Sequence, residues 1–166
     1  MGRPHLTILR GDITDEKGLA ELLAGQDAVI SAVPFLKVNP PILIAAVKEA
    51  GVGRLLVVGG AGSLEVSPGV ALVDTPGFPP SARPESLAGR AFLNTLRQDP
   101  DLDWTFLSPS DRFVPGERTG KFRFGGDTLL VDAQGRSWIS FEDFAIALVD
   151  ELEKPRHSRQ RFTVGY

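Results

Sequence analysis

The sequence predicts an α/β fold in which helices cover both faces of a parallel sheet. Three observations support this class. Short apolar runs occur that are typical of strands buried on both faces. The segments between them carry apolar residues at helical spacing. The two kinds of segment alternate along the chain, as right-handed βαβ units require. A length of 166 residues is that of one domain, so residues 1–166 are assigned to a single domain.

The first strand is predicted at residues 6–10, LTILR. Thr14 is expected to cap a helix whose first turn is acidic and whose inner stripe of leucines ends at Gly25. Residues 28–33, AVISAV, form the next predicted strand, a buried one that Pro34 closes. The chain therefore begins as strand, helix, strand.

A second helix is predicted between Asn39 and Gly51. Asn39 is a suitable N-cap, and Pro40 fits the first helical position. The strand that follows, residues 55–58, leads into the glycine-rich residues 59–62. The alternation is thus continued.

Residues 63–83 are rich in proline and glycine and are too long for a plain connection, so they are hypothesised to form a lid beside the site. Pro84 then opens a helix, and residues 103–107 return as a strand that ends at residues 108–110. The predicted buried face of this helix comprises Leu87, Ala91, Phe92 and Leu96.

After Pro115 the pattern changes to a small antiparallel element near residues 121–139. Residues 121–124 and 128–131 flank a Gly-Gly-Asp sequence, which favours an antiparallel hairpin, and residues 136–139 are expected to add a strand.

The last helix is expected to begin with a capping box and to stop at Pro155. Ser140 and Asp143 have the capping-box spacing, and residues 161–164 form the last predicted strand. The predicted buried face of the helix comprises Phe141, Phe144, Ala145, Leu148 and Leu152.

Composition excludes several classes of function. The formal charge is −3 and the basic residues are scattered, which argues against nucleic acid as a partner. The sequence has no cysteine, so disulfides, thiolate metal sites and a thiol nucleophile are excluded, and no metal site is predicted. Residues 1–5 lack the apolar core of a signal peptide, and no apolar run has the length of a membrane span. The expected location is the cytoplasm, without a membrane partner.

Candidate binding residues follow the predicted strands, because ligands of open parallel sheets bind at the carboxyl ends of the strands. Small residues there let a flat ring or a phosphate approach the backbone, and a carboxylate can accept a hydrogen bond from an adenine amino group. Each residue alone also has a structural explanation, such as a turn, a helix cap or a strand end. Together on one edge they favour a ligand. The candidates are Asp12, Ile13, Ser31, Ala32, Val33, Pro34, the glycine-rich segment Gly59, Gly60, Ala61, Gly62 and Ser63, and then Ser108, Pro109 and Ser110.

Four segments resemble a known family: residues 9–15 (LRGDITD), 26–32 (QDAVISA), 56–63 (LVVGGAGS) and 103–109 (DWTFLSP). They are similar to the NAD(P)H-binding, atypical short-chain dehydrogenase/reductase group, which includes NmrA-like regulators and flavin reductases of the biliverdin-reductase-B type. The resemblance covers essentially the whole chain and implies a Rossmann-like domain with NAD or NADP as cofactor.

The resemblance also implies roles for the candidates. Asp12 and Ile13 would contact adenine, and Ser31, Ala32, Val33 and Pro34 would lie along the cofactor. The nicotinamide would be flanked by Gly59, Gly60 and Ala61 and by Ser108, Pro109 and Ser110.

One departure from the family is the glycine-rich phosphate loop. A complete member opens with a strand, a G-x-x-G-x-x-G turn, a helix and a second strand, and none of these precedes Leu6. The domain is therefore expected to be incomplete at its N-terminus. In the family's strand order this would leave a gap of roughly 14 Å, about three strand spacings, between residues 6–10 and 28–33. Either these two strands pair directly, or another chain supplies strands, or the protein is longer; the last is favoured.

The other departure concerns catalysis, because many members use a Tyr-x-x-x-Lys pair. The only tyrosine is Tyr166, the last residue, and Ala82 followed by Arg83 occupies the place where the tyrosine would be expected. His5 and His157 are expected to be surface residues. No catalytic residue or proton donor is assigned.

Three functions stay open. The first is an NAD(P)H-dependent oxidoreductase that reduces a small flavin-, quinone- or carbonyl-type acceptor. The second is a non-catalytic NAD(P)-binding redox sensor or regulator, and the third is an inactive fragment of such a domain. The predicted partners are the dinucleotide and a small-molecule substrate, and the sequence leaves a homodimer open.

Overall fold

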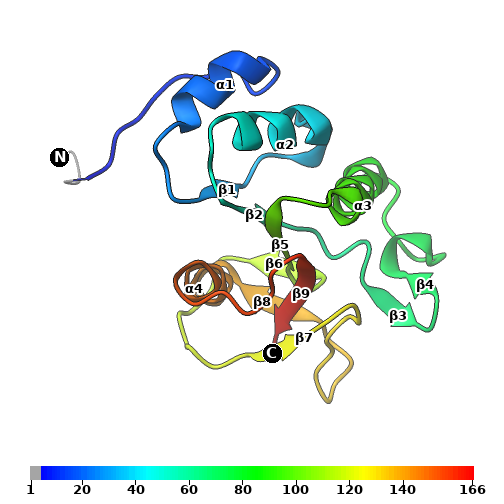
Figure 1. Cartoon of the computed structure of the whole chain (residues 1–166). Helices are drawn as coiled ribbons and strands as arrows, with labels where there is room; N and C mark the ends of the chain where they lie inside the picture. The colour runs from blue at the N-terminus through cyan, green and yellow to red at the C-terminus, as the bar shows by residue number, and fades with distance from the viewer. Residues whose placement is uncertain (1–4) are drawn as a thin grey trace.

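The computed structural model describes residues 5–166 and contains, within that range, four α-helices around a mostly parallel sheet (Figure 1). Most of the N-terminal stretch considered above for a signal peptide, residues 1–4, lies outside the described residues. No helix of residues 5–166 combines the length and the apolar character that crossing a membrane requires.

The central sheet has five strands in the order β1-β2-β5-β9-β7. Strands β1, β2, β5 and β9 are parallel to one another, and β7 is antiparallel to β9. This confirms the predicted parallel sheet. The bounds are Val29–Ser31 for β1, Arg54–Val58 for β2, Asp103–Ser108 for β5, Gln160–Gly165 for β9 and Arg123–Gly125 for β7.

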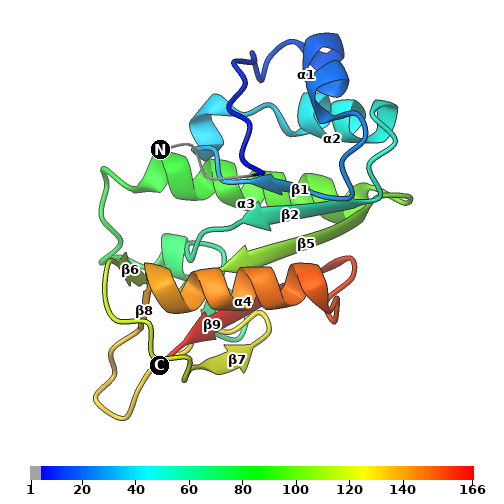
Figure 2. The ribbon, with the colours of Figure 1, turned by 90° about the vertical axis from the view of Figure 1, so that its left-hand side faces the viewer.

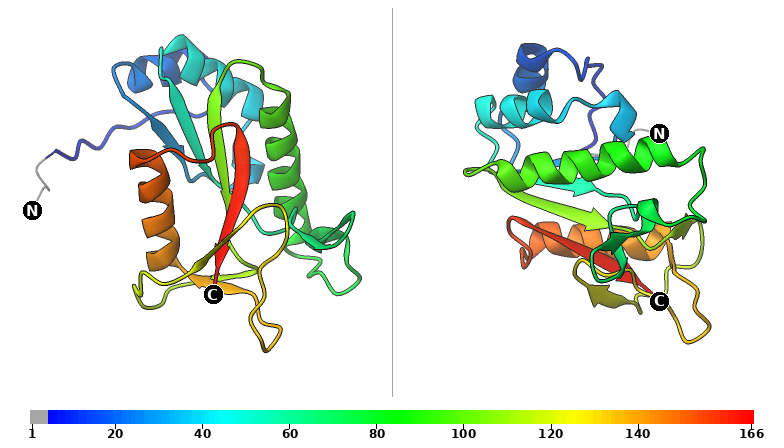
Figure 3. Two further views of the ribbon diagram at one scale, coloured as in Figure 1. Left: turned by 60° about the horizontal axis from the view of Figure 1, so that its bottom comes forward. Right: turned by 90° about the vertical axis from the view of Figure 1, so that its right-hand side faces the viewer.

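Helices lie on both faces of this sheet, as expected. Helices α2 (Pro40–Glu49) and α3 (Arg83–Gln98) cover one face, and α4 (Phe141–Glu153) covers the other (Figure 2). Helix α1 (Glu16–Leu23) packs against α2. Figure 3 shows α3 in front of the sheet when the molecule is seen from the opposite side.

Two apolar clusters form the core, one on each face. Along β2, Leu55 and Val57 contribute to the cluster under α2 and α3, and Leu56 contributes to the cluster under α4. Strand β5 divides in the same way, with Phe106 on the first face and Leu107 on the second. The continuous apolar runs of the sequence are thus strands buried on both faces.

The helix starts follow from local chemistry. Asn39 is the N-cap of α2, with proline in the first turn, as predicted. The Ser140 hydroxyl accepts the amide of Asp143 at 3.0 Å, so Ser140 is the N-cap of α4 as predicted, whereas the Asp143 carboxylate accepts from Gly120 and Tyr166 and does not complete the capping box. The N-cap of α1 is Asp15 and not Thr14, because the Asp15 carboxylate reaches the amide of Gly18 at 3.1 Å.

The stretch predicted as a lid has structure of its own: β3 (Glu65–Ser67), β4 (Val70–Ala71) and the 3₁₀ helix η2 (Leu72–Asp74). The amide of Val73 donates to the carbonyl of Gly62 at 2.9 Å, and the Val73 side chain is fully buried. Residues 62–74 are therefore a packed arm; its movement stays a prediction.

The antiparallel element near residues 121–139 is present, but its pairing differs from the prediction. Strand β7 pairs with β9 and not with residues 128–131. Strand β8 (Trp138–Ser140) pairs in parallel with β6 (Arg112–Val114). A turn sequence alone does not decide whether β7 pairs with the segment after the turn or with β9, a six-residue strand at the end of the chain.

Residues 6–10 do not form the predicted strand. They are not paired with another segment, and Leu6, Ile8 and Leu9 are 62%, 88% and 62% exposed. Figures 1 and 3 show this segment leading away from the body of the molecule. A β-prone sequence becomes a strand only beside another strand, and β1, the edge strand of the sheet, pairs with β2 alone. The direct pairing of residues 6–10 with 28–33 considered above is thus not found.

The buried faces of two helices are also shifted. In α3 the buried residues are Gly89, Phe92, Leu93 and Leu96, so Leu87 and Ala91 are exposed. In α4, Phe141 and Ala145 are exposed, because the buried stripe includes Asp143 and Glu151. Each of these two carboxylates accepts several hydrogen bonds, which lets a charged group take a core position.

Candidate functional site

The carboxyl ends of three neighbouring parallel strands bring most of the predicted site residues to one edge of the sheet. Ser31 ends β1, Gly59 directly follows β2, and Ser108 ends β5. The amide of Gly59 donates to the carbonyl of Leu107 at 2.7 Å, which continues the β2 and β5 pairing into the loop. We call this edge, residues 31–34, 59–63 and 108–110, the strand-end shelf (Figure 2).

Ser31 has an unusual environment within the strand-end shelf. Its residue is 5% exposed, and among residues 5–166 its hydroxyl has no hydrogen-bond partner. A buried hydroxyl without a partner is unfavourable, and native proteins retain few of them. Ser31 is thus a buried, unpaired hydroxyl at the position where the resemblance places the cofactor, and a ligand can bond it only if neighbouring side chains move.

The glycines of the shelf differ in their surroundings. A Cβ on Gly59 would lie 2.4 Å from the Phe106 ring, so packing within the protein explains this glycine. A Cβ on Gly60 would meet the Phe35 ring only at 3.4 Å. The Phe35 ring therefore lies in van der Waals contact with the Cβ side of Gly60, whereas Gly59 is enclosed by Phe106.

Phe35 borders the shelf and was missed by sequence reasoning. It belongs to the 3₁₀ helix η1 (Phe35–Lys37), and its ring stacks on Phe106 with centroids 6.0 Å apart. The carboxylate of Glu85 accepts the amides of Phe35 and Leu36, the second at 3.1 Å. Helix α3 thereby fixes an aromatic ring against Gly60.

A second residue that sequence reasoning missed is Arg161, in β9. Its side chain is 3% exposed and pairs with the carboxylate of Asp127 at 2.5 Å. It also donates to the hydroxyl of Ser63 at 3.2 Å and to that of Ser108 at 3.4 Å. Burial lowers the pKa of Arg161, and Asp127 opposes that effect. The guanidinium thus links Ser63, after β2, to Ser108, at the end of β5. The sequence could have indicated Arg161, because a charged residue inside a strand that is expected to be buried needs a partner.

Ser108 and Ser110, two further serines of the shelf, are already engaged. The backbone carbonyl of Ser108 accepts the hydroxyl of Thr163 at 2.8 Å, and the hydroxyl of Ser110 donates to the carbonyl of Val164 at 2.9 Å. These two contacts hold the shelf to β9, and Ser108, Pro109 and Ser110 are all buried.

Asp12 and Ile13 come from the turn before α1. The Asp12 carboxylate accepts the amide and the hydroxyl of Thr14 at 2.8 Å and 2.7 Å. These two hydrogen bonds, the one from the hydroxyl first, lower the pKa of Asp12. Ile13 packs against the core cluster under α2 and α3. Their contact with adenine stays a prediction.

Tyr166 is held in a polar network at the start of α4. Its phenol donates to Asp143 Oδ2 at 2.7 Å and lies 2.8 Å from the hydroxyl of Ser140. Burial would raise the pKa of Asp143, but the Thr119 hydroxyl, the Gly120 amide and the Tyr166 phenol outweigh it, so this pKa is lowered. The only phenol of the sequence therefore supports the fold around an ionised carboxylate.

Residues 1–155 match a protein family described as NAD(P)H-binding. The uncharacterized protein YwnB of Bacillus subtilis is 48% identical over 125 residues, which are 74% of this chain. The chain spans 59% of the length of YwnB.

Several solved structures share the fold. One from Burkholderia pseudomallei, provisionally named an exported protein, is 48% identical with a TM-score of 0.87, covering 93% of this chain and 79% of that chain. A provisional epimerase from Bacteroides thetaiotaomicron is 42% identical with a TM-score of 0.94, covering 100% and 79%. A provisional NADH-flavin reductase from Streptococcus pneumoniae is 34% identical with a TM-score of 0.79, covering 98% and 81%.

Proposed function

Because this chain belongs to the NAD(P)H-binding family of atypical short-chain dehydrogenases/reductases, we propose that it binds the dinucleotide along the strand-end shelf and reduces a small flavin-, quinone- or carbonyl-type acceptor. The proposal takes residues 1–166 as one nucleotide-binding domain. The name of the Streptococcus pneumoniae relative, an NADH-flavin reductase, supports the choice of a flavin as the first acceptor to test.

The unpartnered hydroxyl of Ser31 is the observation that carries the proposal. It lies at the end of β1, which pairs with β2, and the loop that follows β2 holds Gly60 against the Phe35 ring. A hydroxyl can bond an amide or a ribose hydroxyl, and an aromatic ring can border a flat ligand. These residues fit the nicotinamide end of the cofactor.

The pyrophosphate end has no comparable fit within this sequence. The sequence contains no G-x-x-G-x-x-G motif, and Gly60, Ala61 and Gly62 lead into the packed arm and not into a helix. Apart from Asp12 and Ile13, which the resemblance assigns to the adenine, the residues of this chain are therefore assigned to the nicotinamide half.

The bound cofactor would supply a hydride, and the chain would supply position and surroundings. Phe35 and Gly60 would border the ring, and Ser31 would orient a polar substituent. Arg161 would hold Ser63 and Ser108 in place from below, as its hydrogen bonds to both indicate. Asp12 and Ile13 would meet the adenine.

One observation favours a second candidate function, a redox sensor that binds NAD(P) without turnover. The Tyr166 phenol is bonded to Asp143 and Ser140, and the position expected for a catalytic tyrosine is Ala82, the residue before α3. A proton donor of the Tyr-x-x-x-Lys type is thus not offered by this sequence.

The test combines binding and turnover on the 166-residue chain. NADH and NADPH are titrated separately, and their oxidation is then followed with FMN, a small quinone and a small aldehyde. Saturable binding with acceptor-dependent oxidation supports the reductase, and saturable binding without oxidation supports the sensor. If neither nucleotide binds, both functions are contradicted.

Ser31→Ala is the matched probe of the site, with Ser67→Ala as its control. Ser67 is an exposed serine of β3 outside the shelf. Binding should weaken in the first variant and stay unchanged in the second.

A further inference from the structure

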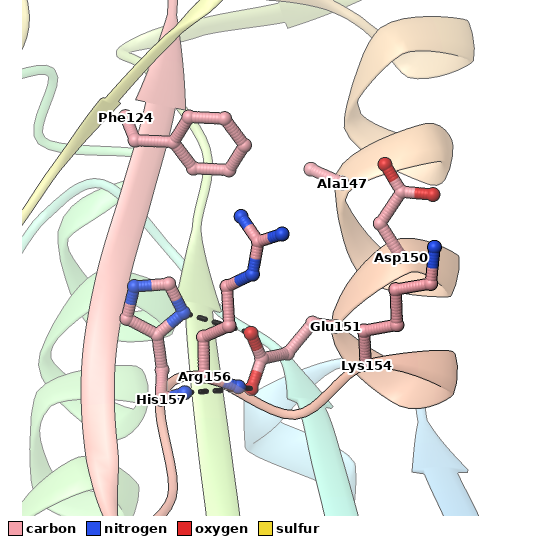
Figure 4. Close-up of a pocket in the computed structure, with 7 residues that line it drawn as sticks. All are labelled: Phe124, Ala147, Asp150, Glu151, Lys154, Arg156 and His157. Atoms are coloured by element: carbon pink, nitrogen blue, oxygen red, sulfur yellow. Dashed lines mark hydrogen bonds and ion pairs between the residues drawn. The ribbon is translucent and has the colours of Figure 1, made fainter.

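A cavity of about 410 Å³ lies at the end of the molecule opposite the strand-end shelf, beside the connection from α4 to β9. Its lining comes from α4, from this connection and from β7 (Figure 4). This connection leads into the amino end of β9, whereas the shelf is formed by carboxyl ends. The inference drawn from it does not depend on the proposed function.

The floor of the cavity is fixed by a buried carboxylate, that of Glu151, whose side chain is 3% exposed. It pairs with Arg54 at 2.8 Å, accepts the backbone amides of Arg156 and His157, and lies 2.8 Å from His157 Nδ1. Burial would raise the pKa of Glu151, but the amide and the imidazole of His157 outweigh it, so this pKa is lowered. Glu151 is thus an ionised group that already accepts several hydrogen bonds and shares the Arg54 guanidinium with Asp103.

Two cations of the lining are not compensated in the same way. Within residues 5–166, the ion pairs include neither Lys154 nor Arg156. Asp150 is the other carboxylate of the lining, so two cations face one unpaired anion. Lys154 caps the end of α4, where a cation is favoured by the helix dipole. Arg156 lies beyond that helix, and Figure 4 shows its guanidinium extending toward Phe124.

Aromatic rings form one wall of the same space. The Phe124 side chain faces Arg156 across the cavity, and Phe124 is 54% exposed (Figure 4). Its ring stacks on Phe162, which also stacks on His157 with centroids 4.0 Å apart and an angle of 12° between the planes. Ala147, on the α4 side, leaves the space opposite Phe124 open. An exposed aromatic ring beside a free guanidinium suits a ligand with a flat apolar part and an anionic group.

We propose that this cavity binds a planar aromatic monocarboxylate, with Arg156 bonding the carboxylate and Phe124 contacting the ring. The guanidinium fork of Arg156, which forms no ion pair within residues 5–166, matches the two oxygens of a carboxylate. A volume of about 410 Å³ accommodates a two-ring acid.

The experiment is a titration of the ¹⁵N-labelled 166-residue chain with naphthoate, followed by backbone amide shifts. Naphthamide is the uncharged match of the probe, and inorganic phosphate is an anion without a ring. Saturable shifts are expected for residues 154–157 and Phe124. Arg156→Gln should weaken naphthoate binding by about tenfold or more, the scale of a charge-assisted hydrogen-bond pair. Phe124→Ala should weaken it by about threefold or more, the scale of an aromatic contact.

Arg118→Gln is the matched control, because Arg118 is an exposed arginine near the other end of α4. It should bind naphthoate as the unchanged chain does. Equal binding of naphthamide, equal binding of phosphate, or undiminished binding by Arg156→Gln would overturn the proposal. Since Arg156 and Phe124 are exposed, unchanged amide spectra elsewhere will show that both variants are folded.

Discussion

Replacing Ser31 with alanine should raise the stability of the free protein. The Ser31 hydroxyl is buried and has no partner among residues 5–166, and such a group costs roughly 1–3 kcal/mol. Removing it should raise the free energy of unfolding by about 1 kcal/mol, at the lower end of that range, because the alanine also leaves a small void. For a chain of this size, that corresponds to a rise of about 2–4 °C in Tm.

The same substitution should weaken binding of the dinucleotide. If the hydroxyl bonds the nicotinamide end, its loss removes one net hydrogen bond, about 0.5–1.5 kcal/mol, which is a change in Kd of about 2-fold to 12-fold. Urea unfolding gives the first quantity and a fluorescence titration with NADH and NADPH gives the second. A substitution that raises the stability of the free protein but lowers its affinity for a ligand is typical of a residue whose role is in binding.

Ser110→Ala is the control for the sign of the stability change. The Ser110 hydroxyl is also buried, but it donates to Val164 at 2.9 Å, so its removal should destabilise by about 1 kcal/mol. A loss of stability in Ser31→Ala, as for a hydroxyl already bonded through water, would refute the reasoning, and so would unchanged affinity.

Three further outcomes are expected from urea unfolding. Arg161→Met should destabilise by about 2–4 kcal/mol, because it leaves Ser63 without its donors; a change below about 0.5 kcal/mol would contradict this contact. Tyr166→Phe should cost about 1–2 kcal/mol at neutral pH and move the acid unfolding midpoint upward, since the lost phenol helps to lower the pKa of Asp143; an unchanged midpoint would count against it. Glu151 also has a lowered pKa, so its stabilisation is full above its ordinary value of about 4.3 and is lost as the pH falls through the folded value; Glu151→Gln should therefore flatten the acid limb of the stability curve.

Much of the fold could be predicted because its elements are locally encoded. Residues 40–49 carry a cap, a proline at the start and apolar residues at helical spacing, and the structure has α2 there. The strands at 54–58 and 103–108 are rich in apolar and β-branched residues, which in an alternating sequence predict a buried parallel sheet. Their shared direction is enough to predict that Ser31, Gly59 and Ser108 lie on one edge of the sheet.

The predictions that were wrong concern segments whose structure depends on contacts with residues distant in the sequence. Residues 6–10 have strand propensity, yet a strand also needs a pairing partner, which propensity cannot supply. The partner of β7 is β9, about forty residues away, and turn chemistry carries no information at that distance. Buried carboxylates such as Asp143 displaced the predicted face of α4, because their stability depends on donors from distant loops.

The candidate site shows the same division. The small residues that follow the strands could be found from the order of elements, because topology brings strand ends together. Phe35 and Arg161 could not be found in this way, because neither directly follows a strand. Phe35 lies in η1 and Arg161 lies inside β9, and each reaches the shelf through its side chain. The positions of Phe35 and Arg161 beside the shelf thus depend on tertiary contacts, which the sequence pattern does not specify.

The central claim is that the strand-end shelf receives the nicotinamide end of NAD(P)H, and amide shifts of the ¹⁵N-labelled chain test it most directly. On titration with NADH or NADPH, saturable shifts should gather in residues 31–34, 59–61 and 108–110. Shifts that gather at the opposite end of the sheet, or none with either nucleotide, would contradict the claim.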